Sequence, residues 1–509
     1  MAASDILFAD VSKLLFSDVR DIVKLAGKEA GRKDAAAWLA GLDDAPPEKV
    51  ASELAERLTK TLAQEQDPLK RLALLNGCES AAATALAALE LATETAPLPL
   101  PAAAMQAAVA ADSLLKVMAT DYAGLALSLQ DKVGGPDDAR ELLRLAALRA
   151  MHALARREVL AYRGHAVPSS ASWKLMQDVY SVARAQGVAG PDKDGAAVEH
   201  EYVAALLLAL ADPARLPRTA LAAAHAFIAG LAPHARIEAA TLPRDDTSCR
   251  FLIATDKGRP AQALAQIEDD KALAPHSLVL NCSGLPPRIE QLLAAGGEAA
   301  PLPPEVMRLL NDSWSAAAAP ARRFSRTQFK RHIDVIAGLP AILRLLSGRS
   351  LGRRQSDAAH GDERDTSEWL VINESPDGFG IRHLGGTAPP LAIGDLVTLR
   401  PREQGKFHIC LVRRHSPAPQ GTELGVQLLC SEATVLPLPS EDILAMGQQG
   451  LLLPRLPGFG NAAGLITAAG ALTAQSVITD NQEGTLKYFR LGSRVASSTA
   501  IEFHLLQSA

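Results

Sequence analysis

The sequence predicts a multidomain α+β protein with a helical amino-terminal part and a β-rich carboxy-terminal part. A chain of 509 residues is longer than one hydrophobic core usually organises. From about Asp5 to Ala229, apolar residues recur every three or four positions, which is the period of an amphipathic helix. After residue 330, short apolar or alternating runs are separated by turn residues, which is typical of strands. We therefore expect four parts: an all-α domain at 1–235, a small α/β connector at 236–319, a β domain at 320–440 and a β-rich segment at 441–509.

The composition is that of an ordinary soluble globular protein, with 48% apolar and 21% charged residues. A net charge of -5 and a pI near 6.2 argue against general binding to DNA or to an anionic membrane surface. The five cysteines are scattered and never in CxxC spacing, so we expect reduced thiols and neither a disulfide framework nor a metal site. The best apolar run, Tyr202–Ala211, is about half the roughly 20 residues of a membrane span, and no secretory signal is visible. We expect a cytoplasmic protein without a membrane span.

The alanine-rich amino-terminal part is expected to hold nine or ten helices, arranged as a bundle or as a TPR-like array. Trp173 and Tyr180 are one helical face apart and are predicted to anchor the core. The basic pair Arg156-Arg157 is predicted to lie on a solvated face. No histidine pairing of the HExxH type occurs, and no set of nucleophile, base and orienting group emerges. We therefore expect a scaffold that binds a protein partner, and not an enzyme.

The connector, residues 236–319, is predicted to contain both strands and helices, unlike the all-helical part before it. Arg250–Thr255 and Ser277–Asn281 are predicted as short strands that pair with each other. Pro286–Ala295 and Pro304–Trp314 are predicted as helices.

A basic cluster follows the connector. Between residues 322 and 354 the chain has nine basic residues and one acidic residue, and the cluster begins with Arg322-Arg323-Phe-Ser-Arg326. In an acidic protein such a cluster indicates a local anionic partner. Arginine can hold a phosphate at two points and can also stack on a purine, and guanine offers O6 and N7 as a paired acceptor edge. A ligand with guanines and phosphates would use all of these contacts.

A second motif, Asn373-Glu-Ser375-Pro-Asp-Gly378, lies between two predicted strands, so that Asn373–Gly380 is expected to be a hairpin connection. The short side chains of Asn373 and Ser375 can bond a base edge or a phosphate. Gly378 is expected to supply a positive φ and to let the backbone approach a ligand.

The order RxxxR, strand, NxSxxG, strand resembles the PilZ domain family of cyclic-di-GMP receptors. Three later segments agree with that family: Ile393–Leu399, Phe407–Arg414 and Glu423–Leu429. The resemblance covers Ala321–Leu429 and implies a six-stranded antiparallel β-barrel that binds cyclic-di-GMP, with no other cofactor. By the same resemblance, the ligand residues are Arg322, Arg323, Arg326, Asn373, Ser375 and Gly378.

The sequence departs from the family pattern between the two motifs. Arg326 and Asn373 are 47 positions apart, because a β-rich segment, Lys330–Leu346, is followed by a polar insertion, Ser347–Glu368. A rival RxxxR pair, Arg349 and Arg353, lies in that insertion. The preferred pair is Arg322 and Arg326, because it directly precedes a predicted strand.

The leading hypothesis is a cyclic-di-GMP effector in which the nucleotide clamps the arginine-rich linker onto the barrel and so reorients the helical part. The alternative is a PilZ-like scaffold that binds protein and no nucleotide. General RNA binding would need exposed aromatic residues among the basic ones, and Phe324 and Phe329 alone give it little support. In the last segment, strands are expected at 451–453, 472–478, 485–490 and 499–506.

Overall fold

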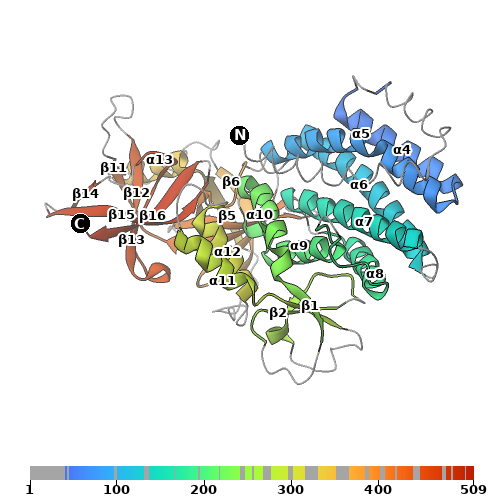
Figure 1. Ribbon diagram of the computed structural model, residues 1–509. Helices are drawn as coiled ribbons and strands as arrows, with labels where there is room; N and C mark the ends of the chain where they lie inside the picture. The colour runs from blue at the N-terminus through green and yellow to red at the C-terminus, as the bar shows by residue number, and fades with distance from the viewer. Residues whose placement is uncertain are drawn as a thin grey trace. The chain divides into compact units, whose positions relative to one another are not determined.

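The structure is a computed structural model of the whole chain (Figure 1). It describes residues 41–42, 45–96, 100–130, 137–164, 166, 168–192, 195–216, 218–240, 247–254, 257–267, 277–295, 302–315, 331–350, 366–384, 389–401, 407–418, 421–438, 448–472, 477–482, 485–498 and 500–508. The chain divides into two compact units. The first extends to residue 321, apart from 97–99 and 214–218, and the second holds those two short stretches and residues 322–509.

Seven described α-helices make up most of the first unit: α4 (Pro47–Gln64), α5 (Pro68–Thr95), α6 (Ala102–Ser128), α7 (Asp137–Arg163), α8 (Ser170–Ala185), α9 (Val198–Leu210) and α10 (Arg218–Leu231). Their starts follow from local chemistry. The Asp67 carboxylate accepts a hydrogen bond from the Leu69 amide at 2.9 Å, and Pro68 stands in the first turn of α5. The Ser169 hydroxyl caps α8 in the same way, accepting from the Ser172 amide at 3.1 Å.

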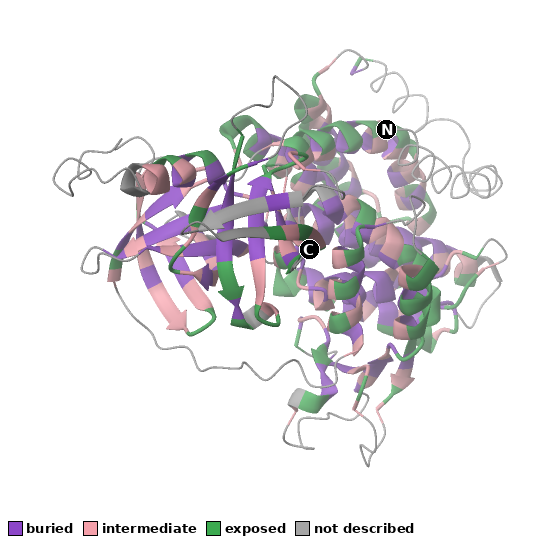
Figure 2. Ribbon diagram, turned by 90° about the vertical axis from the view of Figure 1, so that its left-hand side faces the viewer, coloured by how far each residue is buried: buried purple, intermediate pink, exposed green. Residues whose placement is uncertain are grey.

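Each of these helices carries buried residues, most of them apolar (Figure 2). Trp173 and Tyr180 are both buried, which confirms their prediction as core anchors. The prediction for Arg156 and Arg157 was wrong. Arg156 pairs with Glu90 of α5 at 2.9 Å, and Arg157 pairs with Asp112 of α6 at 2.9 Å. Both guanidinium groups are mostly buried between helices, because acceptors far away in the sequence replace water as their partners.

Helices α5 and α6 are long and apolar enough to cross a membrane, by length and composition alone. A core helix of a water-soluble protein passes the same test. Both helices carry carboxylates paired with arginines of other helices: Glu79 of α5 with Arg149, and Asp121 of α6 with Arg71. Such pairs between helices are expected inside a bundle.

The predicted connector forms a four-stranded antiparallel sheet of order β1-β4-β2-β3 and two helices. The strands are β1 (Arg236–Ala239), β2 (Arg250–Ile253), β3 (Gln262–Ala263) and β4 (Leu278–Asn281), and the helices are α11 (Leu285–Ala295) and α12 (Pro304–Ser315). Strands β2 and β4 pair, as predicted. The fully buried Trp314 of α12 donates its indole N–H to the Leu207 carbonyl of α9 at 3.0 Å. The connector therefore belongs to the same compact unit as the helices.

The second unit begins with a closed six-stranded antiparallel barrel, which confirms the fold implied by the sequence. The strands run in the order β10-β7-β6-β5-β8-β9 around the barrel. Their bounds are β5 (Arg331–Ala337), β6 (Thr366–Ser375), β7 (Gly378–His383), β8 (Leu396–Pro401), β9 (His408–Ala418) and β10 (Gly421–Cys430). Inward side chains such as Val335, Trp369, Ile381 and Val412 fill its interior.

The segment Lys330–Leu346 was predicted to be β-rich, and only its first part is. Helix α13 (Leu339–Ser350) follows β5 directly. Gly338, at a φ of 84°, ends the strand, and Pro340 stands in the first turn of the helix. Leu339 and Ile342 then bury one face of α13.

The carboxy-terminal segment forms a second, six-stranded antiparallel sheet of order β11-β12-β13-β16-β15-β14. Its strands are β11 (Thr434–Pro437), β12 (Gln449–Leu456), β13 (Ala462–Ala468), β14 (Val477–Gln482), β15 (Thr485–Ser497) and β16 (Ile501–Ser508). Strand β13 was missed by the sequence prediction because it follows a glycine-rich stretch. Ile342 of α13, Leu411 of the barrel and Phe503 of this sheet share one core, so the sheet packs on the barrel within this unit.

Candidate functional site

The arginine motif itself, Arg322, Arg323 and Arg326, lies outside the described residues. The structure does describe where this segment enters the barrel. Strand β5 begins at Arg331, which lies opposite Val371 of β6. Asn373 is two residues further along β6, or roughly 7 Å. The segment that carries the arginines therefore meets the barrel close to the second motif. Of the rival pair, Arg349 lies in the last turn of α13 and Arg353 lies outside the described residues.

The second motif forms the tip of the β6–β7 hairpin. The predicted connection, Asn373–Gly380, is shorter in the structure, because Asn373 pairs with Gly380 and Ser375 with Gly378. Only Pro376 and Asp377 remain as the turn. The Ser375 hydroxyl donates to the Gly378 carbonyl at 3.3 Å, across the turn. The motif is thus a rigid hairpin end and not an open loop.

Gly378 is needed here for contact with the neighbouring strand. Its φ of 154° is one that L side chains rarely adopt. A Cβ at this position would overlap the Val426 carbonyl oxygen of β10 and would lie 3.1 Å from the Gln427 Cα. The Leu428 amide of β10 also donates to the Asp377 carbonyl at 2.9 Å. Close backbone packing onto β10, which the sequence did not predict, thus fixes the hairpin tip.

Asn373 holds a hydrogen-bond acceptor that has no partner among the described residues. Its side chain lies across Gly380, where a Cβ would come within 2.7 Å of both amide atoms. Its Oδ1 atom is buried and has no hydrogen-bond partner among the described residues. Leaving a buried acceptor without a partner costs about 1–3 kcal/mol. This is the kind of group that a bound ligand can satisfy.

Paired polar side chains flank this region on β7, β9 and β10. Arg382 forms an ion pair with Glu423 at 2.6 Å. Arg413 donates from Nε to the Gln427 Oε1 at 2.8 Å. Sequence reasoning missed these residues, because their proximity follows from pairing between strands that are distant in the chain.

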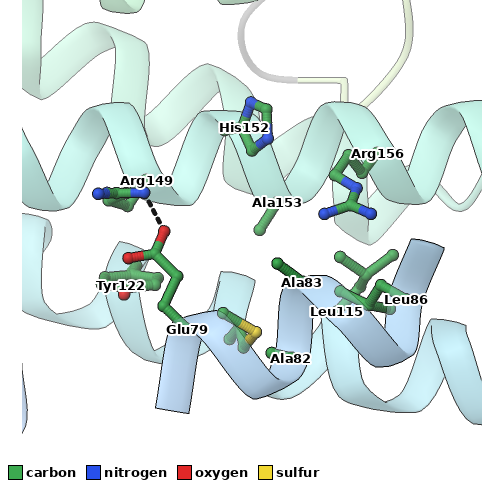
Figure 3. Close-up of a pocket in the computed structure, with 11 residues that line it drawn as sticks. Glu79, Ala82, Ala83, Leu86, Leu115, Tyr122, Arg149, His152, Ala153 and Arg156 are labelled. Atoms are coloured by element: carbon green, nitrogen blue, oxygen red, sulfur yellow. Dashed lines mark hydrogen bonds and ion pairs between the residues drawn. The ribbon is translucent and has the colours of Figure 1, made fainter. Parts of the chain in front are cut away.

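A cavity of about 70 Å³ lies elsewhere, in the helical unit between α5, α6 and α7 (Figure 3). Ala82, Leu86 and Ala153 form much of its apolar lining, and Glu79 and Arg149 form an ion pair at its edge. Burial raises the pKa of the Glu79 carboxyl, although Arg149 opposes this shift. Small-molecule pockets usually enclose about 300–1,000 Å³. This cavity is too small for a cyclic dinucleotide, so the hairpin remains the better candidate.

No group of three or more histidine, cysteine, aspartate or glutamate side chains among the described residues could hold a metal ion. All five cysteines are free thiols. Burial raises the pKa values of Cys78, Cys282, Cys410 and Cys430, which disfavours the reactive thiolate.

Comparison with known families gives two matches. Residues 33–243 match the model of the N-terminal domain of the cyclic-di-GMP receptor FimW, and residues 347–434 match the model of the middle PilZ domain of that receptor. The second match covers strands β6–β10 with the Asn373 motif and the Arg349–Arg353 pair, and it begins after Arg322–Arg326. No curated protein and no solved structure matches the chain.

Proposed function

Starting from the membership of this chain in the PilZ domain family, we propose that it is a cyclic-di-GMP-binding effector and not an enzyme. One observation carries the proposal: the buried, unpartnered acceptor of Asn373 lies at the β6–β7 hairpin, close to the point where β5, which follows the arginine-rich segment, begins.

The chemistry of the hairpin suits a guanine nucleotide. Guanine carries an exocyclic amine, which is a donor that adenine lacks at the same edge. The Asn373 Oδ1 accepts such a donor and gains the partner it lacks. Ser375, two residues on, adds a hydroxyl beside it, and Gly378 keeps the hairpin tip pressed onto β10.

Arg322 and Arg326, with Arg323 between them, supply the positive charge for the two phosphates. We prefer this pair over Arg349 and Arg353 because of the strand register. Arg326 precedes the start of β5 by five positions, and β5 starts opposite Val371, two residues from Asn373. Arg349 and Arg353 instead lead towards Thr366, at the end of β6 that lies away from the hairpin.

The nucleotide acts as a clamp. Its two phosphates neutralise the charge of the arginine segment at the barrel. With the nucleotide bound, the segment is fastened to the hairpin, and the orientation of the barrel to the helical unit changes. The helical unit then serves as the output surface for a protein partner. We place this effector in the cytoplasm, where the nucleotide would be available to it.

Calorimetric titration of the full chain with cyclic-di-GMP tests the proposal. We expect micromolar or tighter binding by the wild type and a loss of at least tenfold in affinity in the Arg322→Ala, Arg326→Ala variant. The matched control is Arg349→Ala, Arg353→Ala, which removes the same charge from the rival pair and should bind like the wild type. If the wild type does not bind, the effector proposal fails and the protein-binding scaffold takes its place. If only the control variant loses affinity, the rival pair holds the ligand.

A further inference from the structure

Four residues lie in one row across the outer face of the barrel. Asn373 of β6 is opposite Gly380 of β7, Gly380 is opposite Gly425 of β10, and Gly425 is opposite Arg414 of β9. The neighbours of Gly380 and Gly425 along their strands, Ile381 and Leu424, point into the barrel core. The row therefore faces outward, because successive residues of a strand point to opposite faces.

Neither glycine in the middle of this row has a side chain of its own, and only Gly425 is left uncovered by Asn373. The Asn373 amide lies over Gly380, which is buried, since a Cβ there would come within 2.7 Å of both amide atoms. A Cβ on Gly425 would lie 3.1 Å from the Arg414 Cβ. Strands in a sheet lie about 4.8 Å apart, so the row from β6 to β9 is roughly 14 Å wide. Within the row, the half-buried backbone of Gly425 is the part that no side chain of its own covers, and it lies between Asn373 and Arg414.

Arg414 stands at the end of this row without a partner. It is exposed, and it makes no ion pair or hydrogen bond with any residue that the structure describes. Other arginines of the barrel differ from it: Arg382 pairs with Glu423, and Arg400 pairs with Asp334 at 2.5 Å. The guanidinium of Arg414 is thus available to a ligand that lies on Gly425.

We propose that one guanine of cyclic-di-GMP lies on Gly425, between Asn373 and Arg414, and that Arg414 recognises its O6 and N7 edge. The inference rests on the function proposed above and assigns it a base-specificity residue. Asn373 then meets the opposite, amine-bearing edge of the same base, since it stands at the other end of the row. Adenine has an amine in place of O6 and no amine on the opposite edge, so both ends of the row favour guanine.

Titrations with cyclic-di-GMP and cyclic-di-AMP, run on the full chain, test this assignment. Arg414→Ala should weaken cyclic-di-GMP binding by about 5- to 150-fold, which is the range of one two-point contact to guanine. The preference for cyclic-di-GMP over cyclic-di-AMP should fall by a similar factor. Arg414→Lys keeps the charge and loses the planar fork, so it should recover part of the affinity and little of the preference. The control is Arg400→Ala, which removes the same charge from a half-buried arginine elsewhere on the barrel and should leave both values unchanged.

A second variant tests the contact between the base and Gly425. Gly425→Ala adds one methyl group to the surface and asks the Arg414 side chain to move by only a few tenths of an ångström. It should weaken cyclic-di-GMP binding while its melting temperature stays near that of the wild type. The inference is overturned if the wild type binds, yet Arg414→Ala binds within twofold of it with the same base preference. A wild type that binds neither nucleotide refutes the proposed function, and the inference with it.

Discussion

Replacing Gly378 by alanine should destabilise the second unit. The backbone there has a φ of 154°, and the added Cβ would overlap the Val426 carbonyl oxygen. Strain at such a φ costs about 1–3 kcal/mol, and forcing an atom into packed surroundings costs a similar amount. Together these make about 2–6 kcal/mol, which lowers the melting temperature of a unit of this size by roughly 4–24 °C.

Scanning calorimetry of the full chain measures this effect, with the transition of the helical unit as the internal reference. The matched control is Gly470→Ala in the same unit. Gly470 also has a positive φ, 71°, but no atom lies within 4 Å of the position a Cβ would take. The control should lose only the left-handed backbone cost of about 1–2 kcal/mol. The reasoning is refuted if Gly378→Ala loses no more stability than Gly470→Ala does.

Three further predictions concern the helical unit. Arg149→Met leaves the Glu79 carboxylate buried without its cation, so urea unfolding at pH 7 should show a free energy of unfolding about 3–5 kcal/mol lower. The control Lys174→Met breaks an exposed pair with Asp178, and its free energy of unfolding should fall by under about 1 kcal/mol. Adding Glu79→Leu to Arg149→Met should recover much of that loss, and a double variant no more stable than the single one would contradict this. Burial raises the pKa of Glu158 from 4.5 to about 8. The folded state therefore holds this proton more tightly than the unfolded state does, and the contribution of this group to stability falls as pH rises from about 4.5 to 8. Glu158→Gln should therefore gain stability over the wild type at pH 8.5 relative to pH 5, and equal differences at the two pH values would exclude this.

The helical period of the sequence was enough to predict the helices of the first unit and their buried faces. The pattern of Leu54, Leu58 and Leu62 identifies the buried face of α4, because a helix sets the environment of a side chain from its own period. The partners of Arg156 and Arg157 could not be found in this way. Their carboxylates lie on α5 and α6, 66 and 45 positions away, and helix packing alone brings them together.

The barrel shows the same division between local and distant information. The motif Asn373-Glu-Ser375-Pro-Asp-Gly378 located the hairpin, but the predicted turn is longer than the two-residue turn of the structure. The need for glycine at position 378 comes from β10, which the chain reaches more than 40 residues later. The row from Asn373 to Arg414 likewise exists only through strand register, so no local pattern could indicate Arg414.

Amide hydrogen exchange of residues 322–330, with and without cyclic-di-GMP, tests the clamp most directly. Fastening this segment to the β6–β7 hairpin should slow exchange of its amides when the nucleotide is added, and the Arg322→Ala, Arg326→Ala variant should show no such slowing. Exchange of these amides that stays the same in the wild type at saturating nucleotide would contradict the clamp.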